Sequence, residues 1–135
     1  MSGFTHLATY HFGAAADGTG EEFKIFKRAA NAGGKAIVER STAADIDAIG
    51  VLQDVGLGSL GQTAAVCVAG VCKVKLGGVF TPGTTRAAFT SDANGLAVPA
   101  ADNEVAVGYL IMDEAVTYAS GDVVNCIVSI SNQGA

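Results

Sequence analysis

The sequence lacks tryptophan altogether and contains little proline, histidine or positive charge. Its 135 residues include 2 Pro, 2 His and 8 Lys or Arg, against 13 Asp or Glu, which gives a formal net charge of −5. An acidic surface repels nucleic-acid phosphates, whose binding requires a basic patch. The one basic cluster, Lys24, Lys27 and Arg28, is flanked by Glu21 and Glu22. We therefore expect no direct nucleic-acid binding.

Long apolar runs are also missing. No segment approaches the ~18 uninterrupted apolar residues that indicate a membrane-spanning helix. The segment Met1–His6 has no basic stretch followed by an apolar run, which is the pattern of a secretory signal. We expect neither a membrane span nor a membrane partner.

Cysteine is scarce, and its spacing is uninformative for chemistry. Cys67, Cys72 and Cys126 make an odd number, and no two of them have the Cys-x-x-Cys spacing of a redox motif or zinc ribbon. All three lie in apolar segments that read as strands. We expect them to be reduced and to act as small buried hydrophobic side chains, which fits synthesis in a reducing cytosol.

The sequence offers no group of residues arranged for catalysis or metal binding. His6 and His11 are five residues apart, and no third ligand accompanies them. The adjacent carboxylates Asp113 and Glu114 would face opposite sides of a strand, so they cannot act as a pair. We expect no catalytic residue, no metal, no cofactor and no enzymatic activity.

One motif resembles a cofactor site in form only. Gly56-Leu57-Gly58-Ser59-Leu60-Gly61 matches G-x-G-x-x-G, which binds a dinucleotide when a helix follows it and receives the pyrophosphate at its N-terminus. Here Gln62–Val68 follows, which reads as a strand, and no acidic residue stands about 20 positions further on. We interpret the motif as a hairpin loop.

A repeat is the most informative feature that is present. The first copy begins at Ile49–Leu52 and resumes, after a small-residue loop, at Gly61–Val68. The second copy begins at Val107–Leu110 and resumes at Gly121–Val128. Each copy has an apolar-Gly-apolar strand start, a turn closed by Gly and a polar residue, and a β-branched strand. The repeat predicts two related hairpins in a β-scaffold.

Short strands and tight turns are predicted for the rest of the chain. Glycine is abundant, at 18 residues, and Val71–Leu76 alternates with both lysines on one face, as in a half-exposed strand. A turn or two of helix is expected from Thr42 to Gly50. The other strands are expected at residues 21–28, 35–40, 50–54, 63–68, 87–90, 105–112 and 123–130. The sequence thus predicts one all-β domain over residues 21–135, a small β-sandwich or barrel-like fold.

Residues 1–20 stand apart from this domain. Phe4, Leu7, Tyr10 and Phe12 are spread among polar residues and glycine without a clean helical or strand period. A segment of this kind cannot bury its aromatic rings against itself. We expect an extended N-terminal arm that is mobile in the free protein and lies on its own domain or on a partner.

Several segments, taken in order, resemble the capsid cement, or head decoration, proteins of tailed bacteriophages. Ala48–Asp54 and Gly61–Val74 match the family's Ile-Gly-Val-Leu-Gln start and its Gly-initiated strand. Thr90–Gly95 matches its Thr-x-Asp-x-x-Gly turn, and closing strands begin at Val107-Gly108 and Gly121-Asp122. The resemblance covers about residues 35–130. It departs from the family pattern before residue 30 and in the bulky run at residues 109–112.

The resemblance implies a structural virion protein rather than an enzyme. Such a protein is made in the host cytoplasm, binds the major capsid protein on the exterior of the assembled capsid and stabilises the shell against packaged DNA. It often self-associates as a homotrimer. Two other interpretations stay open at this stage: another virion β-domain, such as a tail tube or fibre base, and a small-ligand-binding β-barrel or enzyme.

Three segments are the candidates for contacting the capsid or a neighbouring copy. The first is the aromatic set of the arm, the second is the glycine-rich loop, and the third is a Pro-Gly turn. Their residues are Phe4, Tyr10 and Phe12; Gly56, Leu57, Gly58 and Ser59; and Thr81 and Pro82.

Overall fold

The computed structural model describes residues 8–14, 21–29, 37–44, 47–53, 63–83 and 87–132, and these residues are organised as β-strands. The prediction of an all-β fold is confirmed. In chain order the strands are β1 (Ala8–Ala14), β2 (Ile25–Arg28), β3 (Ile37–Arg40), β4 (Ala48–Leu52), β5 (Thr63–Lys75), β6 (Ala88–Ser91), β7 (Ala97–Pro99), β8 (Val105–Leu110) and β9 (Val123–Asn132). Their order in the sheet is β1-β3-β2-β4-β5-β9-β8-β6-β7.

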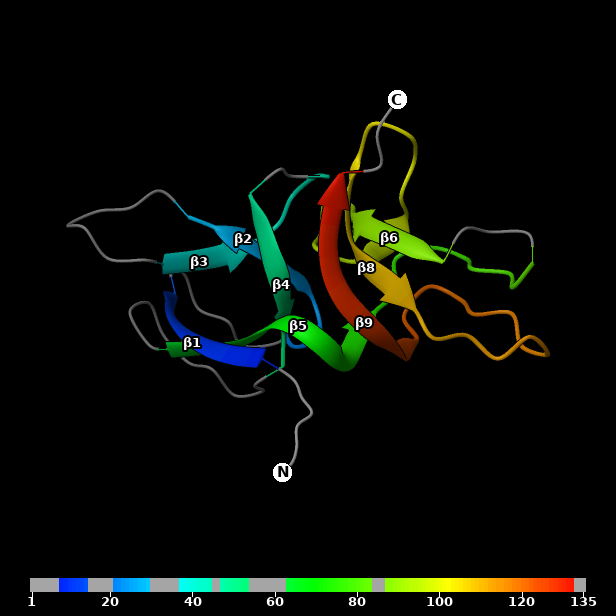
Figure 1. The fold of residues 1–135 in the computed structure, drawn as a ribbon, viewed down its shortest axis with the longest axis horizontal. Coiled ribbons are helices and arrows are strands. Elements are labelled where there is room, and N and C mark those ends of the chain that lie inside the picture. Colours follow the sequence, from blue (N-terminus) through cyan, green and yellow to red (C-terminus); the bar gives the residue numbers. More distant parts are fainter. Residues whose placement is uncertain are drawn as a thin grey trace.

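The first half of the sheet closes on itself. Strands β1, β3, β2, β4 and β5 are neighbours in that order, and β1 also pairs with β5, which completes a ring (Figure 1). Within the ring β1 and β3 run parallel, and the other pairings are antiparallel. Closure removes the free strand edges on which other chains could pair.

The second half curls in the same way. Strands β5, β9, β8, β6 and β7 are antiparallel neighbours. A parallel bridge between Leu76 and Ala97 brings the end of β5 back to β7, and the Gly77 N–H donates to the Ala97 carbonyl at 2.8 Å. The fold therefore consists of two small barrel-like halves, which agrees with the barrel-like alternative of the prediction but divides it in two.

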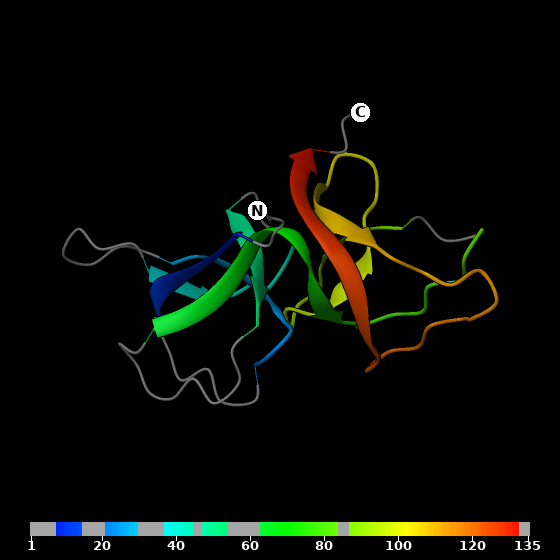
Figure 2. The same cartoon turned by 60° about the horizontal axis from the view of Figure 1, so that its bottom comes forward.

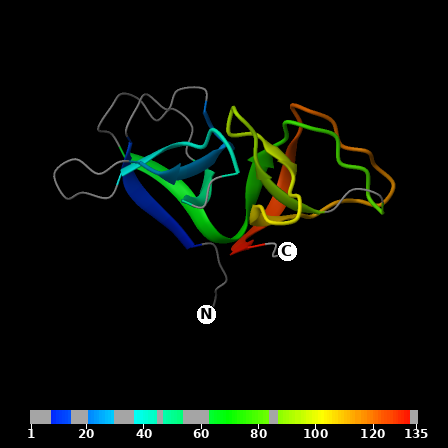
Figure 3. The ribbon, with the colours of Figure 1, turned by 90° about the horizontal axis from the view of Figure 1, so that it is seen from above.

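Strand β5 belongs to both halves. Its residues up to Ala69 pair with β1 or β4, and its residues from Gly70 onward pair with β9. Gly70 has φ of 92°, a conformation open to glycine but costly for other residues, and it lets the strand change direction without ending. Figure 3 shows β5 bending between the two halves. The sequence predicts two strands here, 63–68 and 71–76, because a glycine usually interrupts a strand.

The core extends across both halves. One cluster joins Ile25, Val51 and Cys67 of the first half to Phe80, Phe89 and further residues of the second. A smaller cluster of Phe26, Val38, Leu52 and Val66 lies within the first half. Its members alternate along the strands with members of the larger cluster, so β2, β4 and β5 bury both of their faces.

The three cysteines are buried and free, as predicted from their apolar neighbours. Cys72 of β5 faces Cys126 of β9 across the sheet, and their Sγ atoms are 3.7 Å apart. A hydrogen bond with Cys126 and burial raise the pKa of Cys72 to about 12. A hydrogen bond with Cys72 and burial also raise the pKa of Cys67 well above its usual range. The thiols of Cys67 and Cys72 therefore stay protonated and unreactive in the folded protein.

The helix expected from Thr42 is not formed over residues 41–44, which make a bend, and Ala48 already begins strand β4. Tertiary pairing overrides the capping pattern here. The Ser41 N–H donates to the Ile25 carbonyl at 2.9 Å, which holds the chain against β2. Strand β2 is also shorter than predicted. Residues 22–23 form a turn in which Phe23 has φ of 67°, and its carbonyl accepts from the Lys75 N–H at 2.8 Å.

The expectation that residues 1–20 form an arm outside the β-domain is wrong for Ala8–Ala14. These residues form β1, which pairs with β5 from Ala8↔Ala69 to Gly13↔Thr63 and with β3 at Gly13↔Ile37 (Figure 2). Residue 20 is therefore not a boundary of the sheet, since β1 supplies the strand that closes the first ring. The physical reason is that β3 and the first part of β5 each have an edge with backbone N–H and C=O groups that need partners, and β1 provides them.

Candidate interaction surface

The structure does not bring the residues singled out from the sequence into one site. Phe4 and the loop residues Gly56, Leu57, Gly58 and Ser59 lie outside the described residues. Tyr10 and Phe12 lie in β1, where they pair with Val66 and Ala64 in the first half. Thr81 and Pro82 follow Phe80, which bridges to Tyr118 in the second half. The candidates that the structure describes therefore belong to opposite halves.

A row of exposed apolar side chains crosses three adjacent strands of the second half. Val71 of β5 pairs with Ile127 of β9, and Ile127 pairs with Tyr109 of β8. Their exposed fractions are 52%, 42% and 42%. Because side chains alternate across a strand, the neighbouring residues Cys72 and Cys126 point into the core and are buried.

The row continues along the sheet toward the start of β9. Ile111 and Val123 are exposed apolar residues at that end. Asn125 and Lys73 lie between Val123 and the row, and Ile111 is level with Asn125, to whose carbonyl its N–H donates. We call this set the outer face; it consists of Val71, Lys73, Tyr109, Ile111, Val123, Asn125 and Ile127. Large contiguous apolar patches are uncommon on monomeric soluble proteins and mark interaction sites. Burying one such side chain is worth roughly 1.5–3 kcal/mol.

A shallow hollow adjoins the outer face. It has a volume of about 370 Å³ and is lined by Ile111, Val116, Tyr118, Asp122, Val123, Val124 and Asn125. Its wall is held by the Tyr118 hydroxyl, which accepts from the Asp113 N–H at 2.8 Å, and by the Ile111 N–H, which donates to the Asn125 carbonyl at 2.9 Å. The hollow can receive a side chain from a partner seated on the outer face.

Charges of opposite sign flank the outer face at the end where β9 begins. On the β5 side, Lys73 pairs with Asn125 and Lys75 with Val123. On the β8 side, Asp113 and Glu114 follow the strand and are exposed. Within the part of the chain that the structure describes, Lys73 and Lys75 form no ion pair. One carboxylate oxygen of Asp113 accepts from the Ala115 N–H at 2.9 Å, and none of the described ion pairs involves Asp113 or Glu114. The four charges are therefore available to a partner.

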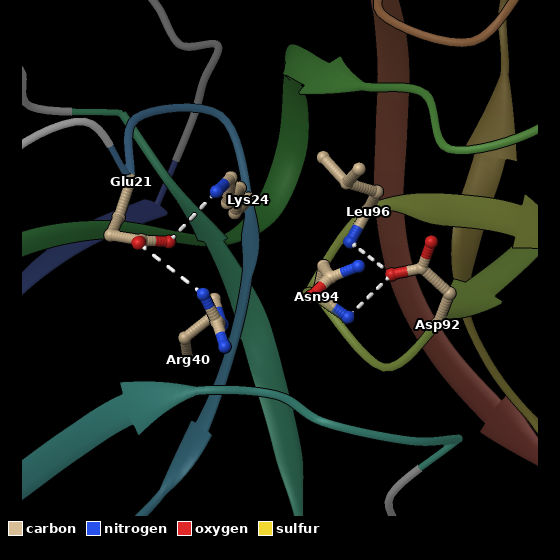
Figure 4. Close-up of polar contacts among 6 residues, drawn as sticks. All are labelled: Glu21, Lys24, Arg40, Asp92, Asn94 and Leu96. Atoms are coloured by element: carbon tan, nitrogen blue, oxygen red, sulfur yellow. Dashed lines mark hydrogen bonds and ion pairs between the residues drawn. The ribbon is translucent and has the colours of Figure 1, made fainter.

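A second polar group has a structural role. Glu21 forms ion pairs with Lys24 at 3.1 Å and Arg40 at 3.4 Å (Figure 4). Beside it, one carboxylate oxygen of Asp92 accepts the N–H groups of Asn94 at 2.8 Å and Leu96 at 2.9 Å. These bonds build the turn predicted at residues 91–95.

That turn also joins the two halves. The Gly95 carbonyl, at its end, accepts from the Ile25 N–H of β2 at 2.7 Å. The carboxylates of Glu21 and Asp92 are thus used in holding the fold.

Among the residues with described positions, no group of three or more His, Cys, Asp or Glu side chains is placed to hold a metal ion. The described part of the chain likewise contains no helix long and apolar enough to cross a membrane.

The outer face is not among the sites predicted from the sequence, although the sequence contains a signal for it. Strand β9 carries apolar residues on both of its faces, Val124, Cys126 and Val128 on one and Val123 and Ile127 on the other. A strand at the surface of a small domain normally has one polar face. Apolar residues on both faces indicate either burial on both sides or an unpartnered interface.

Comparison with solved structures shows a similarity of fold. No family model matches the sequence, and no curated protein does. Among solved structures, the head fiber gp8.5 N base of bacteriophage phi29 superimposes with a TM-score of 0.62 and 17% sequence identity. The two folds are similar. The match covers 92% of this chain and 95% of the phi29 head fiber base, so it includes both halves and not one hairpin.

The similarity to the phi29 head fiber base concerns the fold. At 17% identity, single residues of the outer face are not carried over from one chain to the other. Near-complete coverage of both chains shows that the similarity extends over the whole fold and not over a single element.

Proposed function

We propose that this chain is a structural protein of a phage virion that binds the exterior of the head. The observation that carries the proposal is the similarity of fold, over nearly the whole of both chains, to a protein described as a head fiber base of bacteriophage phi29. The segments resembling head decoration proteins support the same class of function. In this proposal the protein is made in the host cytoplasm and incorporated into the virion.

The physical features fit a binding protein rather than an enzyme. The two halves share one continuous strand and one core cluster, which gives a stiff body. The outer face provides apolar area for binding, and the flanking charges can fix the orientation of a bound partner. The proposed partners are the major capsid protein and further copies of this chain in a homotrimer; neither nucleic acid, membrane, cofactor nor catalysis forms part of the proposal.

Two roles on the head are compatible with this body. As a decoration protein it would cover equivalent positions across the shell and stabilise it, as the sequence resemblance implies. As a fibre base it would sit where a projecting fibre meets the head, which the description of the phi29 protein favours. The residues proposed to contact the capsid or a neighbouring copy remain those of the three segments named from the sequence: Phe4, Tyr10 and Phe12; Gly56–Ser59; and Thr81 and Pro82.

Imaging of the virion tests the proposal and separates the two roles. Electron cryo-microscopy of heads with and without this protein should show density for it on the outer surface of the shell. Density at all equivalent positions, with heads that rupture at lower temperature when it is missing, supports decoration. Density confined to the foot of projecting fibres supports a fibre base. Finding the protein in the tail or inside the head contradicts the proposal.

A further inference from the structure

We infer that the outer face binds the same face of a second copy of this chain, with the lysines of one copy against the carboxylates of the next. The inference names the surface used for the self-association proposed above. It does not depend on where the assembly binds. Three observations carry it: the exposed apolar row, the placement of the flanking charges and the position of the hollow.

The charges are placed so that a rotation brings opposite signs together. Strands β5 and β8 flank β9 on opposite sides, so Lys73 and Lys75 lie on one side of the outer face. Asp113 and Glu114 follow β8 on the other side. Both groups are at the same end of the strands, because Lys75 is level with Val123 and the Ile111 N–H donates to the Asn125 carbonyl.

A rotation axis parallel to the strands therefore pairs the two groups. When copies point their outer faces at such an axis, the β5 side of each copy meets the β8 side of the next at the same height. Lysines then face carboxylates at every junction, in a closed ring of two or three copies. An axis perpendicular to the strands would instead bring the charged end of one copy against the apolar end of the other.

The apolar row lies between the charged sides and becomes the centre of the contact. Val71, Ile127 and Tyr109 would be buried there, and apolar residues at the centre with charges at the rim are typical of homomeric interfaces. The hollow shares Ile111, Val123 and Asn125 with the outer face, so a side chain of the neighbouring copy can enter it. The rim charges fix the register of the copies and discriminate against other partners.

A first experiment tests the apolar centre in purified full-length protein, without heads. Sedimentation equilibrium should show concentration-dependent association of the unmodified chain. Ile127→Glu should weaken it at least tenfold and leave the melting temperature unchanged, because the side chain is exposed. Val79→Glu is the matched control: Val79 is 58% exposed but lies outside these three strands, so association should be unaffected. A monomeric wild-type protein, or equal effects of both variants, overturns the inference.

A second experiment tests the charge pairing. Reversing the lysines (K73E with K75E) and reversing the carboxylates (D113K with E114K) should each weaken association at least tenfold. Combining all four substitutions in one chain should restore it, since every junction again joins opposite charges. Mixing the two reversed proteins should restore association in a two-membered ring but not in a three-membered ring, where charges cannot alternate. If the variant with all four substitutions fails to associate although its melting temperature is unchanged, the inference is wrong.

A further comparison keeps this result separate from the proposed function. If Ile127→Glu fails to associate but still saturates phage heads, the proposed function stands and the contact between copies is not needed for it. If the unmodified chain is monomeric and Ile127→Glu abolishes head binding, the outer face binds the capsid and the inference is wrong.

Discussion

The side chain of Gln53 occupies the place of a missing strand beside Lys73. Its amide nitrogen donates to the Lys73 carbonyl at 2.9 Å, and its carbonyl oxygen accepts from the Lys73 N–H at 3.3 Å. In this part of β5 the opposite edge pairs with β9, so the edge facing Gln53 has no strand partner at this residue. One side chain therefore satisfies both backbone groups of an otherwise open strand position.

Replacing Gln53 should destabilise the fold moderately. Gln53→Ala removes the two hydrogen bonds to Lys73 and two longer ones from the amide nitrogen to the Val51 and Leu52 carbonyls. Water can substitute at the exposed bonds to Lys73, so we expect a loss of about 1–2 kcal/mol in the free energy of unfolding. Gln53→Glu keeps the acceptor but puts a carboxylate oxygen, which cannot donate, against the Lys73 carbonyl, so its loss should be at least as large. Urea denaturation measures both. Asn125→Ala, an exposed amide on the neighbouring strand, should stay within about 0.5 kcal/mol of the wild type.

The glycines of the two repeats should be irreplaceable for one shared reason. A Cβ atom on Gly50 would overlap the Cys67 carbonyl, and one on Gly108 would overlap the Ile127 carbonyl. Both obstacles are backbone atoms of the paired strand, which cannot move alone. We expect Gly50→Ala and Gly108→Ala each to cost about 3 kcal/mol or more.

The control for this prediction is Gly83→Ala. A Cβ there meets nothing within 4 Å, so the remaining cost comes from its φ of 81° and should be about 1 kcal/mol. Thermal melting of the three variants decides the point. If Gly50→Ala or Gly108→Ala has the same melting temperature as Gly83→Ala, the paired strands can separate locally to accept a methyl group, and the prediction is wrong.

Stability should fall at alkaline pH because of the buried thiols. The hydrogen bond with Cys126, together with burial, raises the pKa of Cys72 to about 12 from the ordinary 9.0. The folded protein therefore keeps this proton while the unfolded chain loses it, and the stabilisation is complete below about pH 9 and disappears as the pH rises toward 12. Cys72→Ala should show a shallower decline than the wild type between pH 9 and 11 in urea denaturation. Identical slopes would rule out this origin for the decline.

Removing β1 should damage the domain itself. The arm interpretation of residues 1–20 predicts that their deletion leaves melting nearly unchanged, whereas β1 pairs with both β5 and β3. We expect deletion of residues 1–14 to lower the melting temperature sharply and to promote aggregation through the exposed strand edges. Deletion of residues 1–7 leaves all described pairings of β1 in place and should change melting little. A truncated protein lacking residues 1–14 that melts like the full chain would restore the arm interpretation.

Much of the fold could be predicted from local pattern. The alternation in Val71–Leu76 and the two Gly-containing hairpins identified β5, β8 and β9, because strand period and turn chemistry are local properties. The two hairpins indeed correspond to the pairs β4–β5 and β8–β9. The turn at Thr90–Gly95 was predictable for the same reason, since Asp92 bonds to backbone groups within four residues.

What could not be predicted depends on distant contacts. Strand β1 contains a short alternation, Ala8, Tyr10 and Phe12 against Thr9 and His11, but its partners are far away in the sequence. The continuity of β5 through Gly70 depends on a second sheet being present to receive it. The outer face required knowledge of which neighbours leave Val71, Tyr109 and Ile127 uncovered.

Binding to phage heads tests the central claim most directly. Purified protein is titrated onto expanded heads that lack it, and bound protein is measured by co-sedimentation. We predict saturable binding at a fixed number of copies per head, reduced by substitutions within the segments proposed to contact the capsid, such as Pro82→Asp. Binding that does not saturate, or that is equally strong to unrelated particles of the same charge, would contradict the account.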